Sequence, residues 1–312
     1  MEPGLLKSAD WPVLIDLYFF LGGIAGGAFV IATIAYLLDA ERYRSVVRIG
    51  YYVALLAVIP APLLLIVDLG LPTRFLHMLM VPKTSTSIGM GAITFGPFHL
   101  KPASPMSAGA WALLVFSGCA FLAALDVLLE HRGGRGFPAL RMAVGLVGSV
   151  FGFFLAAYPG VLLGATARPL FVNGHWLGAL FLAVGAATGT AAIALVLAVL
   201  GGERRDALAA LMRVLSVALV VQAIALALFV ATVRMSGSVG VGHALNALLS
   251  GPYSLTFWLG AVVVGLVVPL ALQFAGVGLR RGSAGMVAVV ALLVLVGGFV
   301  IKYVLVAAGQ VI

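Results

Sequence analysis

Charged residues are scarce in this chain. Lys, Arg, Asp and Glu make up 9% of the 312 residues, whereas about 25% is usual for a soluble domain. Hydrophobic residues make up 63%. So few charges could not solvate that much apolar side chain, so the composition excludes a soluble globular protein.

Cysteine is almost absent, because Cys119 is the only one. A single thiol cannot form a disulfide within the chain or supply the four thiolates of the usual iron–sulfur cluster. Bis-histidine haem needs imidazoles that face each other inside a bundle, but all five histidines fall in connections or at helix edges. They are His77, His99, His131, His175 and His243. We therefore expect no haem, no iron–sulfur cluster and no metal site within this chain.

The formal net charge is +8, which raises the question of a nucleic-acid partner. Nucleic-acid-binding surfaces gather their basic residues into one patch or stripe. Here the basic residues are scattered in small groups between apolar runs, so we expect no nucleic-acid partner and interpret the pattern as a signal of membrane topology.

Eight apolar stretches are each long enough to cross a bilayer, because about 20 helical residues span its hydrocarbon core of about 30 Å. The predicted helices are residues 14–38, 46–69, 107–129, 140–163, 175–200, 212–233, 255–274 and 285–308. Asp39 and Glu41 follow the first stretch in place of a cleavage site, so we expect it to be retained. We predict an all-α integral membrane protein: a single polytopic domain over residues 1–312 with about eight transmembrane helices, which could form two four-helix bundles.

Basic residues favour one face of the predicted topology. The short connections after helices one, three, five and seven carry eleven of them, and the opposite face carries six. By the positive-inside rule the short connections are cytoplasmic. We expect a multi-pass protein of the bacterial or archaeal inner (cytoplasmic) membrane, with both termini outside. Two long loops, residues 70–106 and 234–254, then face outward, where a partner would dock.

Five polar residues lie near the outward ends of the predicted helices. They are Asp16, Tyr18, Asp68, Tyr158 and Lys302. Tyrosine and lysine are common at the headgroup level, which is one interpretation. The other is a polar pocket that hydrogen-bonds and protonates an amphipathic carbonyl compound such as a quinone. In that interpretation Asp16 and Asp68 are candidates for proton exchange, and either could pair with Lys302.

Two other features have competing interpretations. Asp126 and Glu130 are one helical turn apart. They are interpreted either as part of a solvated helix end or as the start of a proton path. Gly22 and Gly26 form a small-residue stripe, for which we favour close helix packing over any chemistry.

Several segments resemble the NrfD/PsrC-like family, the membrane subunits of polysulfide reductase and formate-dependent nitrite reductase. The most specific are Asp68-Leu69-Gly70-Leu71-Pro72-Thr73-Arg74-Phe75 and Ser104-Pro105-Met106-Ser107-Ala108-Gly109-Ala110-Trp111. The others are residues 18–27, Tyr158-Pro159-Gly160, Arg168-Pro169-Leu170 and residues 303–310. Their order along the chain agrees with the family, and the likeness covers nearly the whole chain.

The resemblance implies a membrane anchor that exchanges electrons between menaquinone or ubiquinone and an iron–sulfur subunit on the outward loops. That subunit would serve a catalytic subunit, often a molybdopterin enzyme. The tyrosine of Tyr-Pro-Gly contacts quinone in the family, a role that carries onto Tyr158. The candidate quinone-binding residues are Tyr158, Tyr18, Asp16, Asp68, Lys302 and Arg168. The family commonly has arginine where this chain has Lys302.

Three functions therefore remain open from the sequence. The first is the quinone-binding subunit of an oxidoreductase complex. Such a subunit is either non-catalytic alone or oxidises quinol or reduces quinone within the complex. A multi-helix transporter or proton-translocating module would act without a partner subunit. A purely structural anchor would hold an extrinsic enzyme at the lipid bilayer without contacting quinone.

Overall fold

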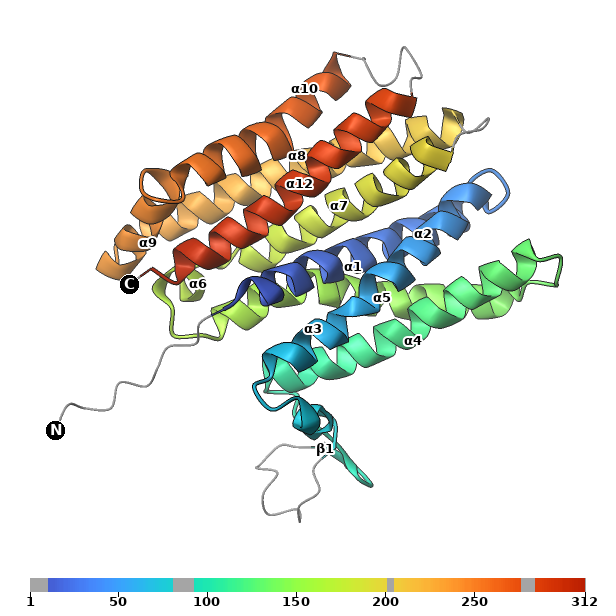
Figure 1. Ribbon diagram of the computed structural model, residues 1–312, viewed down its shortest axis with the longest axis horizontal. Helices are drawn as coiled ribbons and strands as arrows, with labels where there is room; N and C mark the ends of the chain where they lie inside the picture. Colours follow the sequence, from blue (N-terminus) through green and yellow to red (C-terminus); the bar gives the residue numbers. More distant parts are fainter. Residues whose placement is uncertain (1–10, 81–92, 201–204, 276–283, 312) are drawn as a thin grey trace.

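The chain folds as a bundle of long helices (Figure 1). This computed structural model describes residues 11–80, 93–200, 205–275 and 284–311. Eight spans in these residues are long and apolar enough to cross a membrane. They are α1 (Val13–Asp39), α2 (Arg44–Val58) continued by α3 (Pro60–Asp68), α4 (Pro105–His131), α5 (Pro138–Gly164), α7 (Leu177–Leu200), α8 (Arg205–Met235), η3 (Thr256–Val267) continued by α10 (Val268–Phe274), and α12 (Ala284–Gly309). The prediction of an all-α membrane protein with eight spanning helices is confirmed.

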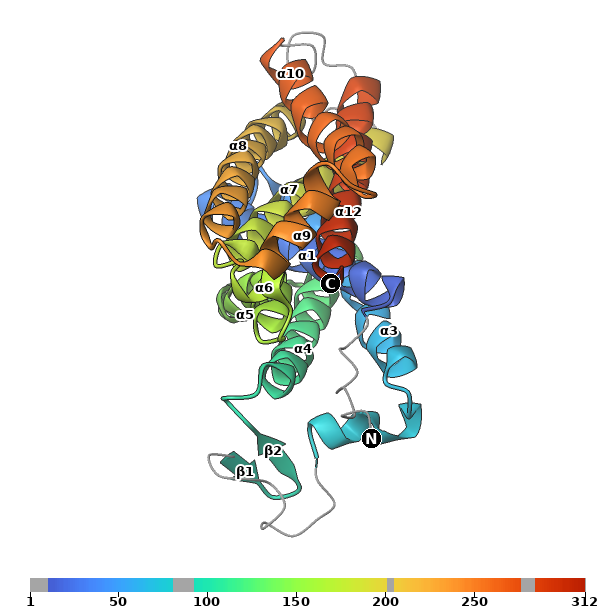
Figure 2. The ribbon, with the colours of Figure 1, turned by 90° about the vertical axis from the view of Figure 1, so that its left-hand side faces the viewer.

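The spans pack as two groups of four. In the first bundle α1 contacts α2 and α5, and α4 closes the ring by contacting both α2 and α5. In the second bundle α7 contacts α8 and α12, and the seventh span closes the ring, because η3 contacts α12 and α10 contacts α8. Since α1 also contacts α7 and α12, it lies where the two bundles meet (Figure 2).

Glycines set how closely α1 approaches its neighbours. Gly26 lies against the backbone of Gly152 in α5, and Gly27 lies against the backbone of Gly185 in α7. A Cβ atom at Gly26 or Gly27 would overlap those backbone atoms. Lipid supplies no hydrophobic force to hold helices together, so close van der Waals packing of small residues replaces it. The glycines of α1 therefore act in packing.

Two spans depart from regular α-helical geometry. Pro60 has no backbone N–H to continue the series of helical hydrogen bonds. The span is therefore interrupted, with α2 ending at Val58 and α3 beginning at Pro60. In the seventh span, η3 is a π-helix of 12 residues that passes into α10 at Val268, one residue before Pro269. Such irregularities are tolerated within a membrane where neighbouring helices cover the freed backbone groups.

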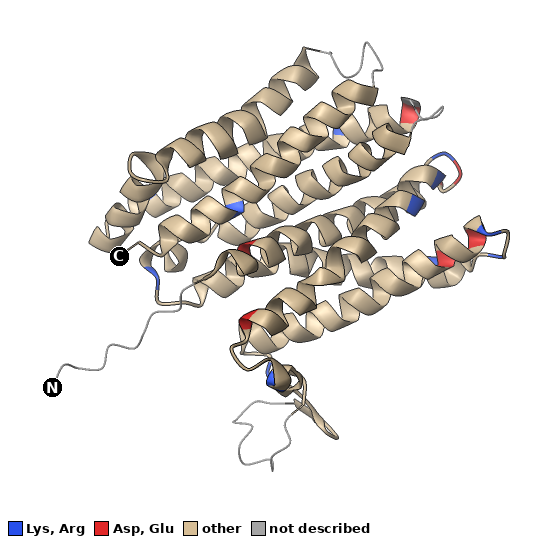
Figure 3. Cartoon of the chain, viewed as in Figure 1, with Lys and Arg blue, Asp and Glu red and all other residues tan. Residues whose placement is uncertain are grey.

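The two ends of the bundle differ. At the end we call the termini end, the Trp11 amide donates to Gln310 Oε1 (2.7 Å) and Gln310 Nε2 donates to the Trp11 carbonyl (3.3 Å). These bonds tie the start of α1 to the end of α12. The other end, which we call the arginine end, carries Arg44, Arg48 and Arg141. Figure 3 shows that charged residues gather at the helix ends and are sparse between them.

The connections at the termini end are structured. They contain the 3₁₀ helix η1 (Pro72–Met78), a hairpin of β1 (Ile93–Phe95) and β2 (Phe98–Leu100), and the short helices α6 (Pro169–Val172) and α9 (Val239–Leu249) (Figures 1 and 2). The first long loop predicted, residues 70–106, holds η1 and the hairpin, and its residues 81–92 lie outside the described part. The second, residues 234–254, contains α9.

Candidate functional site

Four of the predicted site residues lie inside helices near the termini end. Asp16 and Tyr18 are in the first two turns of α1, Tyr158 is six residues before the end of α5, and Lys302 is seven residues before the end of α12. At about 1.5 Å per residue these positions are roughly 4–10 Å inside their helices. All four side chains are buried.

Asp16 is the least satisfied of these groups. It is 2% exposed, and its Oδ1 atom has no hydrogen-bond partner among the described residues. A buried carboxyl oxygen without a partner is costly, because it has left water and gained nothing in return. Such a group in a membrane helix therefore points to a ligand or to an exchanging proton.

Tyr158 lies at the same end of the bundle, on the neighbouring helix α5. Its ring stacks on Phe154 with 5.5 Å between centroids, and it packs against Gly109 of α4, where a Cβ atom would collide with the ring. The Tyr158 hydroxyl forms no hydrogen bond with the described residues. The Tyr158 hydroxyl can therefore donate a hydrogen bond to a ligand in mostly apolar surroundings.

Lys302 is fully buried where the two bundles meet. Its Nζ donates to the Phe19 carbonyl at 2.6 Å and lies 5.2 Å from the centroid of the Phe181 ring. Gly23 leaves the space that the ammonium group fills. In the described part of the chain no carboxylate is within ion-pair distance of Lys302. The expectation that Asp16 or Asp68 would pair with it is therefore wrong, because a backbone carbonyl takes that place.

The other two predicted residues lie apart from this group. Arg168 is buried in the loop before α6, where its Nη1 donates to the Gln310 carbonyl at 2.9 Å. It therefore joins the contacts that close the termini end. Asp68 is exposed at the last position of α3. The structure thus gathers Asp16, Tyr18 and Tyr158 at one end of the first bundle, with Lys302 beside α1, and leaves Asp68 at the surface.

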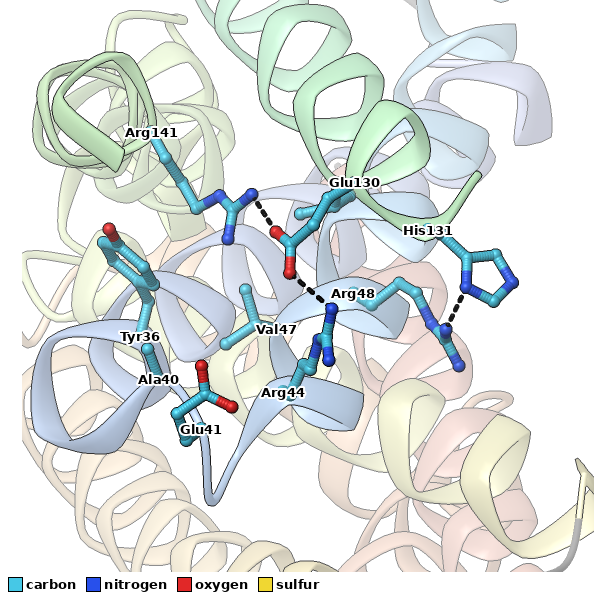
Figure 4. A pocket seen from close by; sticks show the side chains of 10 residues that line it. Tyr36, Ala40, Glu41, Arg44, Val47, Arg48, Glu130, His131 and Arg141 are labelled. Atoms are coloured by element: carbon cyan, nitrogen blue, oxygen red, sulfur yellow. Dashed lines mark hydrogen bonds and ion pairs between the residues drawn. The ribbon is translucent and has the colours of Figure 1, made fainter. Parts of the chain in front are cut away.

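An ion-pair network at the arginine end escaped the sequence reasoning. Asp126 is 3% exposed and accepts hydrogen bonds from Arg141 Nε at 2.5 Å and from the Phe137 amide at 2.7 Å. Arg141 also pairs with Glu130, which accepts from Arg44 Nη2 at 2.7 Å (Figure 4). The interpretation of Asp126 as a solvated helix end is therefore wrong. The sequence did contain a signal for this pairing. The short connection between α4 and α5 makes them antiparallel neighbours, which brings Arg141, near the start of α5, beside the acids near the end of α4.

In the residues that the structure describes, no group of three His, Cys, Asp or Glu side chains could hold a metal ion. The buried polar groups at the termini end include one carboxyl, two phenols and one ammonium. That donor set suits hydrogen bonding and proton exchange with an organic carbonyl compound.

Comparison with known proteins adds family evidence to this geometry. The family model described as "Polysulphide reductase, NrfD" matches residues 2–312. The chain is 26% identical over 318 residues to the Protein NrfD homolog of Haemophilus influenzae, covering 96% of this chain and 94% of that protein. It is 27% identical over 314 residues to the C chain of polysulfide reductase from Wolinella succinogenes, covering 96% and 93%. A shorter match of 76 residues, 25% identical, covers 24% of this chain and 18% of the C subunit of selenate reductase from Mesobacillus selenatarsenatis.

Proposed function

Since the chain belongs to the polysulphide reductase NrfD family, we propose that it is the quinone-handling membrane subunit of a reductase complex. It would exchange electrons between membrane quinone and an extrinsic iron–sulfur subunit that serves a catalytic, molybdopterin-dependent subunit. Two relatives are named as components of a reductase, one of polysulfide and one of selenate. The observation that carries the proposal is the buried Asp16 Oδ1, which has no hydrogen-bond partner in the described part of the chain and lies at the same end of the first bundle as Tyr158.

The residues at the termini end fit a quinone headgroup. A headgroup is a flat ring with carbonyl oxygens, so it needs an apolar slot with a few hydrogen-bonding groups. Tyr158 offers a hydroxyl on a ring that stacks on Phe154, and Asp16 offers a buried oxygen; in the part of the chain that the structure describes, neither atom has a hydrogen-bond partner. A bound quinol would supply two electrons and two protons.

Each residue then has a defined task. The Tyr158 hydroxyl donates a hydrogen bond to a headgroup oxygen and fixes its orientation. Asp16 accepts the two protons of the quinol one after the other on Oδ1 and passes each to water at the termini end, which is close because Asp16 lies in the first turn of α1. Lys302, held by the carbonyl of Phe19, lies one turn along α1 from Asp16 and adds a hydrogen-bond donor group at the edge of the site.

The proposal also gives an orientation. We place the termini end outside the cytoplasmic membrane of a bacterium or archaeon and the arginine end inside, in accord with the positive-inside rule. The iron–sulfur subunit would dock over η1, the hairpin, α6 and α9, which lie at the end of the bundle where α1 begins and α12 ends (Figure 2). Electrons would then travel a short path from the pocket to the partner.

Replacing Tyr158 with phenylalanine is expected to weaken quinone binding about two- to tenfold, because one hydrogen bond contributes about 0.5–1.5 kcal/mol. The ring contacts with Phe154 and Gly109 would remain, so the complex should still assemble. Quinone affinity and quinol oxidation are measured on the purified complex. Tyr303→Phe is the matched control, because its ring stacks on Phe299 in α12 and its change should leave both values as in the unaltered protein. Equal behaviour of the two variants would remove Tyr158 from the site.

Purification with native partners tests the wider proposal. The protein, isolated in mild detergent, should carry an iron–sulfur subunit and extractable quinone, and the complex should transfer electrons from quinol. A partner-free protein that moves a solute would indicate a transporter instead. A complex that holds the enzyme but neither binds nor oxidises quinol would indicate a structural anchor.

A further inference from the structure

One face of the hairpin formed by β1 and β2 carries only apolar side chains. The two strands pair Ile93 with Leu100 and Phe95 with Phe98. Because side chains alternate between the two faces of a strand, these four lie on the same face. Ile93, Phe95 and Phe98 are 47%, 57% and 39% exposed. A cluster of exposed apolar side chains marks an interaction surface, so this face should be covered by something other than water.

The opposite face of the hairpin is polar. It carries Thr94 and His99, which are paired across the two strands. Thr94 is exposed and His99 is buried. A hairpin with one apolar and one polar face fits a boundary between an apolar phase and water. At such a boundary the outer edges of the two strands can still form hydrogen bonds with water, which the bilayer core would not allow.

Two contacts hold the hairpin beside the first two turns of α4. Trp111 Nε1 donates to the His99 carbonyl at 2.9 Å, and the rings of Trp111 and Phe98 meet edge to face with 6.0 Å between centroids. Trp111 lies six residues after Pro105, the first residue of α4, which is about 9 Å along the helix. Tryptophan near the end of a span is typical of the headgroup level of a bilayer. The hairpin is therefore held at that level.

The hairpin and η1 lie beside the first bundle and not over it. In the view from the termini end, both lie outside the group of spans, beyond α3 and α4, whereas α6 and α9 lie over the spans (Figure 2). The neighbouring surface of α4 is apolar and exposed, since Leu114 is 49% and Phe121 is 55% exposed. In a spanning helix such a surface faces lipid. The apolar face of the hairpin, which contacts α4 at Trp111, therefore continues the lipid-facing surface of the bundle.

The charges of this segment suit a phospholipid surface. Residues 69–125 contain no Asp or Glu. Arg74 lies in η1, next to Phe75 and Leu76, which are 43% and 45% exposed, and Lys101 follows β2 directly. Basic side chains are attracted to lipid phosphates, and aromatic side chains are enriched at the same level of the membrane. The segment thus combines the two kinds of side chain that the headgroup region favours.

We propose that η1 and the hairpin form an interfacial lipid anchor at the termini end of the first bundle. The apolar face of the hairpin rests on the outer ends of the acyl chains, and Arg74 and Lys101 contact lipid phosphates. Phospholipid is the occupant because the hairpin lies at headgroup level and outside the group of spans. The anchor is independent of the proposed quinone chemistry. It leaves α6, α9 and the Thr94 face of the hairpin to the proposed iron–sulfur subunit.

Nitroxide labels on single cysteines show which phase covers each face of the hairpin. The full chain with the buried Cys119 replaced by alanine carries either Phe95→Cys or Thr94→Cys in phospholipid nanodiscs, alone and in the complete complex. Oxygen collects in hydrocarbon, whereas the polar chelate nickel ethylenediaminediacetate stays in water. Accessibility to nickel should be about tenfold lower at residue 95 than at residue 94, because a polar solute is costly to transfer out of water. Accessibility to oxygen should be higher at residue 95.

Thr94→Cys is the matched control, because Thr94 precedes Phe95 in the same strand and points to the opposite face. Leu114→Cys gives the reference value for a lipid-covered position. Equal nickel accessibility at residues 94 and 95 would show that water covers the apolar face. Low accessibility to both reagents at residue 95 would show that protein covers it, a second copy in the chain alone or a partner in the complex. Either result overturns the anchor, and neither bears on the proposed quinone site, because no quinol is present.

A fluorescence measurement covers the case in which a nitroxide label disturbs the hairpin. Phe95→Trp keeps an aromatic ring at the position, and Thr94→Trp is its control. Both variants share the four native tryptophans, so a difference between them comes from the added indole. Phospholipids brominated near the headgroup end of their acyl chains should quench Phe95→Trp more strongly than Thr94→Trp. Equal quenching in the two variants would contradict the lipid anchor.

Discussion

Replacing Arg141 with alanine is expected to destabilise the folded protein by about 3–5 kcal/mol. Asp126 would remain 3% exposed with its charge uncompensated, because the Phe137 amide alone would still donate to it. Glu130 would lose one of its two arginine partners. Thermal unfolding in detergent measures the loss as a large fall in Tm.

Two variants show whether the buried charge causes that loss. Arg44→Ala removes another arginine from the same network, but the Arg44 side chain is 62% exposed, so its pair with Glu130 should contribute at most about 1 kcal/mol. Adding Asp126→Asn to Arg141→Ala removes the stranded charge and should restore part of the stability. If Arg141→Ala is no more harmful than Arg44→Ala, the network is a solvated surface feature.

Replacing Asp16 with asparagine is expected to slow quinol oxidation by about 10²-fold, the lower bound usual for losing a general acid–base group. The amide is almost isosteric with the carboxyl but cannot exchange a proton in this way, so the fold and the quinone affinity should change little. Steady-state turnover and quinone binding, measured on the same preparation, separate the two effects.

Asp39→Asn provides the control for this substitution. Asp39 ends the same helix at the arginine end, where it accepts a hydrogen bond from the Arg42 amide, and its change should leave turnover unaltered. Asp68→Asn separates the two acids considered from the sequence. A full loss of turnover in Asp68→Asn with normal rates in Asp16→Asn would move proton exchange to the exposed end of α3.

Much of the fold follows from the sequence, because lipid allows few solutions to a run of about 20 apolar residues. The starts of spans are less predictable. α8 begins at Arg205, seven residues before the predicted 212, since a helix can extend past the apolar segment that reveals it. The gathering of Asp16, Tyr18 and Tyr158 near one end was also foreseeable, because their positions within antiparallel helices fix their depth.

Contacts between helices are less accessible to sequence reasoning. Lys302 is satisfied by the Phe19 carbonyl, and carbonyl groups are the same at every residue, so no side-chain pattern marks this partner. The pairing of Asp126 with Arg141 and of Thr33 with Tyr51 depends on how α4, α5, α1 and α2 rotate about their axes. Helix rotation is set by packing, here by glycines such as Gly26 and Gly152.

Labelling with a photoreactive quinone tests the central claim most directly. The purified complex is illuminated with an azido-quinone, digested, and mapped by mass spectrometry, with excess unlabelled quinone as competitor. The account predicts competable labels on α1 and α5 within a turn of Asp16, Tyr18 or Tyr158, and a strong decrease of those labels in Tyr158→Phe. Competable labels confined to the second bundle or to the arginine end, or no competable label, would contradict it.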